Sequence, residues 1–285
     1  MIRLSAFADE AHDSLEGQIA ALQRNNIPYI ELRGINGTNI AKVTEEQAVE
    51  YAAQLKAGGI KVWAIGSPIG KVYLHDDLEA HMQQLRHICR LAKIFGTEKI
   101  RMFSFKRPWD QEPMVYEYLR KMVRIATEEG CVLYHENEKA IFGDTAERVM
   151  RIMQNVEGLK YVYDPANFLE VGESADVTLA PLFDKMDYFH IKDVIAETKQ
   201  LVPAGHGDGR IAELIARIGC CEDRVLTIEP HLKVFSGYGE IDDTKMNNKY
   251  CYATNGEAFD AAVAALKKLL LEGGYKETEG GFVKV

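Results

Sequence analysis

Short strand-like runs alternate with helix-like stretches along nearly the whole chain, and this alternation limits the folds that the chain can adopt. The strand candidates are mostly apolar and rich in β-branched or aromatic residues, as strands buried on both faces are. They cover residues 2–7, 29–32, 61–65, 99–103, 131–136, 160–163, 188–191 and 224–228. Between them lie stretches with apolar residues at helical spacing, at residues 14–25, 45–57, 78–95, 113–129, 145–155, 178–185, 210–218 and 256–271.

This order of elements predicts an α/β protein that forms a single (β/α)₈ TIM barrel domain over residues 1–285. The chain shows no linker that would divide it. The rival fold is an open doubly wound sheet, which would normally carry a Gly-rich phosphate loop after an early strand. The only Gly-rich run of this kind, at residues 205–209, comes late and lacks the P-loop lysine. We expect it to be either a flexible loop that closes over a substrate or a plain connection.

Four consecutive strand candidates in the second half each end on a residue type that binds metals. The residues are Glu136, Asp164, His190 and Glu229. In a (β/α)₈ barrel the C-terminal ends of the strands meet at one face, where the active site forms. Each residue alone has an ordinary reading as a helix cap, an ion-pair partner or a core histidine. Their repetition at the same end of four strands favours a site for Mn²⁺, Mg²⁺, Co²⁺ or Zn²⁺.

Charge and composition argue against some partners. A net charge of −9 makes attraction to nucleic acid backbones a poor expectation. No apolar run approaches the roughly 18 residues of a membrane span, and the first ten residues include Asp9 and Glu10, which do not suit a signal peptide. The five cysteines lack CxxC spacing. We therefore expect a reduced, cytoplasmic protein without nucleic acid or membrane partners.

The segments around the four residues resemble those of a known family. His135-Glu136-Asn137, the YVYDPAN run that contains Asp164, the FHIKD run that contains His190 and the TIEPH run that contains Glu229 are similar to the metal-binding segments of xylose-isomerase-like barrels. The resemblance covers essentially the whole chain. That group includes ketose 3-epimerases, inosose dehydratase and sugar-phosphate isomerases.

The resemblance implies that the four residues bind one divalent metal ion, with Mn²⁺ as the first expectation. It also implies that Glu136 and Glu229 serve as acid and base while they bind the metal. A divalent cation can chelate a carbonyl and a neighbouring hydroxyl of a sugar and stabilise the enediolate that forms on loss of a proton. We therefore expect a metal-dependent isomerase or epimerase of a sugar, keto-sugar or cyclitol.

Other functions remain open at this stage. The same proton abstraction becomes elimination when a leaving group lies β to the lost proton, so a lyase or dehydratase acting on an inosose or 3-keto-glycoside is the alternative. Apurinic endonucleases share the barrel, but they need further histidines and a basic groove, which suit this acidic chain poorly. A sugar-binding protein without catalysis is the expectation if the four residues do not converge.

Several neighbouring residues are candidate contacts for a small carbohydrate substrate, namely Asn167, Lys192, Glu138, His206 and Trp109. Lys192 follows His190 by two positions and so faces the same side of an extended strand. Glu138 has the alternative of an ion pair with Lys139. In the ketose epimerases a histidine commonly stands three positions after the strand-end aspartate. This chain has Asn167 there, and an amide cannot shuttle a proton near neutral pH.

Three further predictions concern the surroundings of the site. His135 should point away from the pocket, because side chains alternate along a strand. Arg101, Lys106 and Arg107 are candidates for binding a phosphate or carboxylate group. The long segment at residues 231–255 is a candidate lid or oligomer contact, and the protein is a candidate homo-oligomer.

Overall fold

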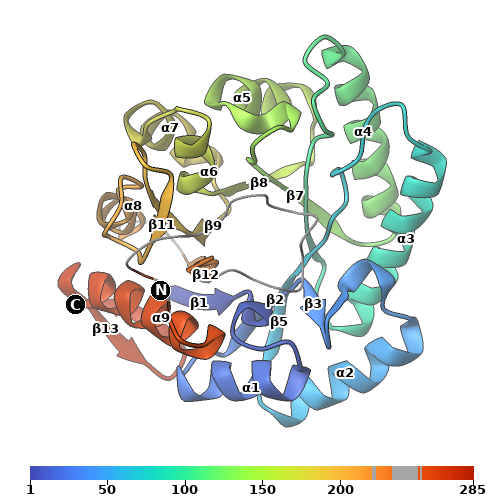
Figure 1. Cartoon of the computed structure of the whole chain (residues 1–285). Helices are drawn as coiled ribbons and strands as arrows, with labels where there is room; N and C mark the ends of the chain where they lie inside the picture. The colour runs from blue at the N-terminus through green and yellow to red at the C-terminus, as the bar shows by residue number, and fades with distance from the viewer. Residues whose placement is uncertain (220–222, 233–249, 251) are drawn as a thin grey trace.

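The computed structural model describes residues 1–219, 223–232, 250 and 252–285. In this part of the chain parallel strands curl into a TIM barrel with helices around it (Figure 1), as predicted. The barrel strands are β1 (Ile2–Ala6), β2 (Tyr29–Leu32), β5 (Lys61–Gly66), β6 (Lys99–Met102), β7 (Val132–Glu136), β8 (Lys160–Tyr163), β9 (Tyr188–Ile191) and β12 (Arg224–Ile228). The predicted strand ends differ from these by at most one residue.

Parallel ladders connect the strands in the order β2, β5, β6, β7, β8, β9, β12, β1. Strand β1 packs beside β2, which closes the ring. At the edge away from β12, β1 also pairs antiparallel with β14, where Ile2 lies opposite Phe282. The four strands that carry the predicted metal ligands are therefore consecutive in space as well as in sequence.

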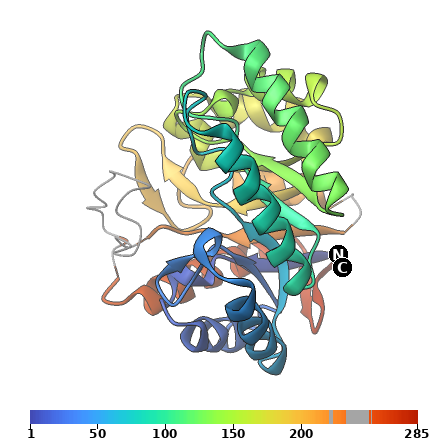
Figure 2. The same ribbon diagram turned by 90° about the vertical axis from the view of Figure 1, so that its right-hand side faces the viewer.

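Helices surround the barrel (Figures 1 and 2). They are α1 (Leu15–Arg24), α2 (Glu45–Ala57), α3 (Leu78–Ile94), α4 (Glu112–Glu128), α5 (Ala146–Asn155), α6 (Pro165–Glu170), α7 (Ala175–Leu182), α8 (Ile211–Ile218) and α9 (Asn255–Glu272), with 3₁₀ turns η1 (Ala8–Glu10), η2 (Ile40–Lys42), η3 (Phe142–Asp144) and η4 (Phe183–Lys185). Side-chain caps fix several helix starts; Thr44, for example, forms a capping box with Gln47 at the start of α2. In the described residues no helix has the length and apolar character of a membrane span.

The sequence did not predict the short elements at the ends of the barrel. These are α6 and three hairpins: β3 (Gly34–Ile35) with β4 (Thr38–Asn39), β10 (Asp193–Ile195) with β11 (Gln200–Val202), and β13 (Tyr275–Thr278) with β14 (Gly281–Lys284). Strands of two to four residues give too few positions for an alternating pattern. The predicted lid or oligomer contact at residues 231–255 falls mostly on 233–249 and 251, which lie outside the described residues.

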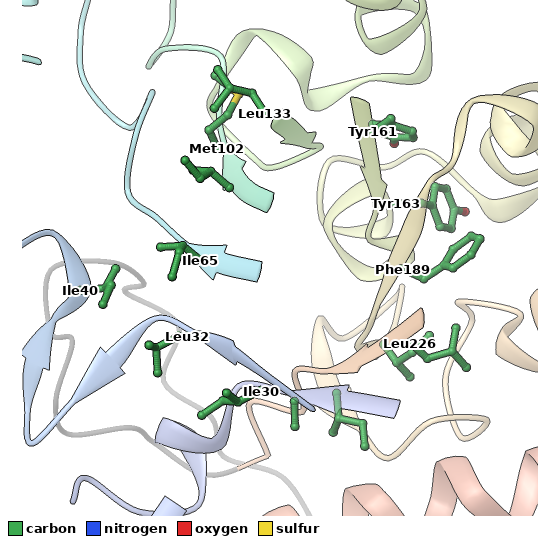
Figure 3. Packing of buried hydrophobic residues seen from close by; sticks show 14 of the residues in the cluster. Ile30, Leu32, Ile40, Ile65, Met102, Leu133, Tyr161, Tyr163, Phe189 and Leu226 are labelled. Atoms are coloured by element: carbon green, nitrogen blue, oxygen red, sulfur yellow. The ribbon is translucent and has the colours of Figure 1, made fainter. Parts of the chain in front are cut away.

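Apolar side chains form separate clusters on the two faces of the strands. The larger cluster includes Leu133, Tyr161, Phe189 and Leu226 and packs between strands and helices (Figure 3). Residues that alternate with these belong to a second cluster, made of Tyr134, Val162, Tyr188 and Val225. Because side chains on a strand alternate, the second cluster fills the inside of the barrel. The same alternation sends Glu136 and His190 inward, above that cluster.

Candidate metal centre

The structure brings the four predicted ligands together. Glu136, Asp164, His190 and Glu229 each offer a ligand atom, and these atoms all lie within 4.8 Å of one another. All four residues are buried, with exposed fractions of 6% or less. Glu136 and His190 belong to β7 and β9, while Asp164 and Glu229 directly follow β8 and β12. The site therefore lies at the C-terminal ends of four adjacent strands.

Local structure fixes the orientation of Asp164. This residue is the N-cap of α6, and its Oδ1 accepts hydrogen bonds from the backbone N–H groups of Ala166 at 2.8 Å and Asn167 at 3.1 Å. Pro165 occupies the first helical position, where its missing N–H costs nothing. The other oxygen, Oδ2, lies 2.9 Å from Lys192 Nζ. The cap thus leaves Oδ2, which faces Lys192 but makes no hydrogen bond, as the oxygen available to a cation.

His190 is held between carboxylates on both sides of its ring. Nδ1 lies 3.1 Å from Glu136 Oε1 and 3.3 Å from Glu229 Oε2. Nε2 lies 3.1 Å from Oε2 of Glu31 in β2, and the other oxygen of Glu31 accepts a hydrogen bond from Tyr188 at 3.0 Å. A carboxylate behind an imidazole is the arrangement that orients metal-binding histidines. Nδ1 is then the nitrogen available to a metal.

The electrostatics of the site favour positive charge at its centre. Burial alone would lower the pKa of His190, but the Glu136 and Glu31 carboxylates raise it well above its usual value. Burial raises the pKa of Asp164 to about 7, an effect that Lys192 opposes and the carboxylates of Glu229 and Glu136 strengthen. Burial opposes the ionisation of Glu229, yet Lys192 and His190 bring its pKa well below the usual value.

These residues fit a divalent cation. His190 Nδ1 and Glu229 Oε2 are buried, and neither atom makes a hydrogen bond. Buried polar atoms without such a partner are rare and need an explanation. One imidazole nitrogen with three carboxylates is a donor set suited to Mn²⁺, Mg²⁺, Co²⁺ or Zn²⁺. A cation held between them would satisfy both orphaned atoms.

Two of the predicted substrate contacts lie beside this centre. Asn167 donates to Glu136 Oε1 at 3.2 Å and to the carbonyl of Asn137 at 2.9 Å, and its Oδ1 accepts from Lys192 Nζ at 2.8 Å. Burial alone would lower the pKa of Lys192, but Asp164 and Glu229 raise it well above its usual value, so its side chain is an ammonium. Asn167 therefore links Glu136 to Lys192.

The other three predicted contacts are more exposed than Asn167 and Lys192. Glu138 forms an ion pair with Lys71 at 2.9 Å. Trp109 is 42% exposed, and the Arg148 guanidinium lies 4.5 Å from the centre of its ring. His206 is exposed, and its ring centre lies 5.7 Å from that of Tyr250.

Lys139, the other predicted partner of Glu138, has its Nζ 3.2 Å from Glu170, and its backbone N–H donates to Glu138 Oε1 at 2.9 Å.

His135 points away from the site, as the alternation predicts. Its Nε2 lies 2.9 Å from Ser104 Oγ, and its ring stacks on Tyr161. Gly143 lies directly against it; a Cβ on this glycine would lie 2.6 Å from His135 Nε2.

The Gly-rich run at residues 205–209 is tied down rather than free. The Asp193 carboxylate accepts hydrogen bonds from the N–H groups of Gly205 at 2.8 Å, Gly207 at 3.1 Å and Gly209 at 2.9 Å. A Cβ on Gly209 would lie 2.8 Å from Asp193 Oδ1. Glycine is thus needed for close approach to Asp193, and of the two expectations for this run these hydrogen bonds favour the plain connection.

Sequence reasoning missed the charged residues that the first strands contribute to the site. Glu31 supports His190, and Arg33 Nη1 lies 3.0 Å from Glu229 Oε1. Asp9 and Glu10, read only as evidence against a signal peptide, are ion-pair partners of Arg33. Arg101 is not free to bind a phosphate, because its Nε lies 3.1 Å from Glu136 Oε2. A charged residue inside an apolar strand, as Glu31 is in Tyr-Ile-Glu-Leu, was the available signal.

Comparisons with known proteins agree with this fold. A search of curated protein sequences found no match. Among solved structures, the chain is similar to the probable 3-DHS dehydratase AsbF of Bacillus anthracis, with 16% identity, a TM-score of 0.71 and coverage of 94% of this chain and 99% of that one. An L-ribulose 3-epimerase gives 18% identity, a TM-score of 0.71 and coverage of 95% and 97%. The IOLI protein with a bound zinc atom gives 15% identity, a TM-score of 0.70, and coverage of 95% of this chain and 97% of that one.

At these low identities the structural likeness shows the fold, and two of the three similar structures carry enzyme names while the third holds zinc. The sequence itself gives the family. Residues 19–238, which include all four converging residues, match the family described as xylose isomerase-like TIM barrel. Since this match spans most of the chain, the protein belongs to the xylose isomerase-like TIM barrel family.

Proposed function

We propose that this protein is a divalent-metal-dependent enzyme that isomerises or epimerises a sugar, keto-sugar or cyclitol. The observation that carries the proposal is the convergence of Glu136, Asp164, His190 and Glu229 within 4.8 Å, all buried at the C-terminal ends of barrel strands. We infer that residues 1–285 form a single domain, a view supported by one apolar cluster that includes residues from Ile2 to Phe282.

Glu136 and Glu229 are the proposed acid–base pair. When bound, the cation would polarise a substrate carbonyl and stabilise the negative charge that develops as the adjacent carbon loses its proton. Glu136 Oε1 and Glu229 Oε2 both lie close to His190 Nδ1, at 3.1 and 3.3 Å. One glutamate would take the proton from carbon and the other would return a proton on the opposite face or at the neighbouring carbon. Asp164 and His190 complete the proposed metal ligands.

The proposed substrate contacts form two groups. Asn167 and Lys192 are buried beside the acid–base pair and would hold hydroxyl oxygens near it. Glu138, His206 and Trp109 are more exposed and would contact parts of the substrate farther from the reacting carbon. We expect a small carbohydrate as the substrate, and neither nucleic acid nor a membrane as a partner.

A lyase is the second candidate, and one observation favours it. The Lys192 ammonium is buried and fixed between Asp164 Oδ2 at 2.9 Å and Asn167 Oδ1 at 2.8 Å. A fixed ammonium can donate a proton to a departing hydroxyl or glycosidic oxygen, which a dehydratase or a lyase of 3-keto-glycosides requires. The dehydratase named among the similar structures is consistent with this alternative.

Proton exchange distinguishes these functions. The protein is loaded with Mn²⁺ and incubated in D₂O with a panel of ketoses, inososes and 3-keto-glycosides. An isomerase or epimerase incorporates deuterium at carbon and yields a product of otherwise unchanged mass, whereas a lyase yields a product that has lost water or the aglycone. Absence of exchange and of elimination across the panel, in protein that binds the metal, contradicts both functions.

Three further properties are proposals. We propose Mn²⁺ as the physiological ion, with Mg²⁺, Co²⁺ and Zn²⁺ as alternatives, because carboxylate-rich sites accept Mn²⁺ readily. We propose a cytoplasmic location, because the described Cys89 and Cys131 are buried free thiols. Homo-oligomer formation is also proposed; gel filtration with light scattering measures it.

A further inference from the structure

Two arginines, the partly buried Arg33 and the buried Arg101, reach the metal centre from the half of the barrel that supplies no ligands. The four proposed ligands come from β7, β8, β9 and β12 or directly follow them. Arg33 follows β2, and Arg101 lies in β6. Their side chains are 11% and 5% exposed. Along the ring, β6 adjoins β7, and β2 is separated from β12 only by β1. Each arginine is therefore near one end of the row of ligand strands.

Arg33 is fixed on three sides. Its Nε and Nη2 donate to the two oxygens of Asp9 at 2.9 and 3.0 Å, and Nη2 also donates to Glu10 at 3.1 Å. The guanidinium carbon lies 4.4 Å from the centre of the Phe7 ring. Its remaining nitrogen, Nη1, donates to Glu229 Oε1 at 3.0 Å. The guanidinium plane, held by these contacts, determines where that oxygen lies.

Arg101 lies beside Glu136 as an ion-pair partner, without a hydrogen bond from its Nε. Its Nε lies 3.1 Å from Glu136 Oε2, and its Nη1 donates to the carbonyl of Ser67 at 2.9 Å. The guanidinium carbon lies 4.5 Å from the centre of the Phe103 ring and 5.5 Å from that of Phe7. Both arginines thus contact Phe7, and each contacts the outer oxygen of one proposed acid–base glutamate.

The inner oxygens of the two glutamates are left for the centre of the site. Glu229 Oε2 and Glu136 Oε1 lie 3.3 and 3.1 Å from His190 Nδ1. We propose that Arg33 and Arg101 are positioning residues that fix Glu229 and Glu136 so that each presents a single oxygen to the cation and the substrate. The expected effect of the arginines on turnover rests on the proposed function. Their expected effect on the geometry of the two carboxylates does not.

Arg33 also explains why a second group of residues that could bind a metal lies close together. Glu10, Glu229 and His231 bring ligand atoms within 4.8 Å of one another. The Arg33 guanidinium already donates to Glu10 and Glu229, at 3.1 and 3.0 Å. A second metal ion there would lie against a fixed positive charge. The guanidinium is the counter-ion of this cluster, which agrees with a positioning role.

Lysine variants test the proposal, because lysine keeps the charge but lacks the planar fork of donors. In Arg33→Lys and Arg101→Lys we expect kcat to fall about 100-fold, as a displacement of about 1 Å at a reacting group does. KM and the Mn²⁺ dissociation constant should stay within about threefold, because the ligands and substrate contacts remain. Arg86→Lys is the matched control. Arg86 pairs with Glu128 and Glu129 on the surface, and its variant should keep full activity.

Chemical rescue and infrared spectroscopy separate positioning from a general structural role. Guanidinium ion added to Arg33→Ala should restore at least part of kcat, and an equal concentration of sodium ion should not. In Mn²⁺-loaded protein, the separation of the two carboxylate stretching bands reports one-oxygen or two-oxygen binding. It should shift toward two-oxygen binding in both lysine variants and stay at the wild-type value in Arg86→Lys.

The outcomes for this proposal and for the proposed function are distinct. Lysine variants with wild-type kcat and wild-type infrared bands overturn the positioning role while the enzyme remains active. A loss carried by KM or by metal affinity alone also overturns it. If wild-type protein shows no turnover but the infrared shift occurs in both variants, the proposed function fails and the positioning role stands.

Discussion

Two fully buried histidines lie in different regions of this barrel, and their surroundings differ in charge. His190 points into the barrel mouth, where Glu31, Glu136 and Glu229 surround its ring. His135 points into the layer between strands and helices, against Ser104, Tyr161 and Gly143. Carboxylates raise the pKa of His190 well above the usual value, whereas burial alone lowers that of His135 to about 3.

The difference shows that burial does not determine the chemistry of a side chain by itself. Both histidines have an exposed fraction of 0%. The inside of the mouth gathers charged groups from many strands, so an imidazole there lies among carboxylates that favour a cation beside it. The outer layer gathers apolar groups and hydroxyls, so an imidazole there stays neutral and serves packing. The strand alternation decides which region each side chain enters.

The largest effect is expected from the acid–base glutamates of the inner region. Glu136→Gln and Glu229→Gln should each lower the rate of proton exchange at carbon by about 10³-fold, because the amide cannot accept the proton. Deuterium incorporation by the Mn²⁺-loaded variants measures this. Glu98→Gln, at a surface glutamate with 63% exposure, is the control and should keep the wild-type rate. Wild-type exchange in either inner variant would show that the glutamate is not part of the chemistry.

The next effect separates the two histidines directly. Mn²⁺ at about 100 times its dissociation constant should stabilise the folded protein by about 2.7 kcal/mol, since it binds only the folded site. The melting temperature should then rise by about 5 °C. His190→Asn should abolish this rise, and His135→Asn should keep it, as differential scanning fluorimetry with and without EDTA would report. An equal rise in both variants would contradict the division between inner and outer regions.

Packing in the outer region predicts a smaller, metal-independent effect. A methyl group on Gly143 would lie 2.6 Å from His135 Nε2 and 3.2 Å from Ile152 Cδ1. Gly143→Ala should therefore reduce the free energy of unfolding by about 2 kcal/mol through overpacking. Gly256→Ala is the matched control, because its new Cβ would meet only Arg24 and Thr254 atoms at 3.4 Å and beyond. Urea unfolding of both variants measures the difference, and an unperturbed Gly143→Ala protein would argue against the tight contact.

The pH dependence of stability should show an effect of similar size. The folded state keeps His135 neutral down to about pH 3, whereas the unfolded chain binds a proton near pH 6.5. Stability is therefore unaffected above the unfolded pKa and is lost as the pH falls from 6.5 toward 3, by about 2 kcal/mol at pH 5. Between pH 7.5 and 5, wild type should lose about 2 kcal/mol more than His135→Gln in urea unfolding. Equal losses would mean that His135 is not held neutral.

The sequence predicted the barrel and the ligand half of the site well. Buried strands have a strong compositional pattern, and Glu136, Asp164, His190 and Glu229 stand at strand ends, where a barrel brings residues together whatever its loops do. The structure brings these four together. Their roles as metal ligands and acid–base residues stay predictions.

The other half of the site was not predictable in the same way. Arg33 pairs with Asp9, and Glu31 contacts His190 on a distant strand. No spacing rule relates such partners to each other. The sequence predicted that Arg101 could bind a phosphate or carboxylate group of a ligand. It could not show that Glu136 Oε2 lies 3.1 Å from Arg101 Nε. The hydrogen bonds of Gly205, Gly207 and Gly209 to Asp193 were also not predicted. A Gly-rich run looks flexible in the sequence, because the sequence does not show its partner.

The most direct test is a crystal structure of the protein soaked in Mn²⁺, with anomalous diffraction data. The account predicts one strong anomalous peak per chain, in contact with Glu136, Asp164, His190 Nδ1 and Glu229 and with no contact to His135. An anomalous map without a peak among these four side chains, from crystals in which Mn²⁺ is bound elsewhere or nowhere, would contradict it.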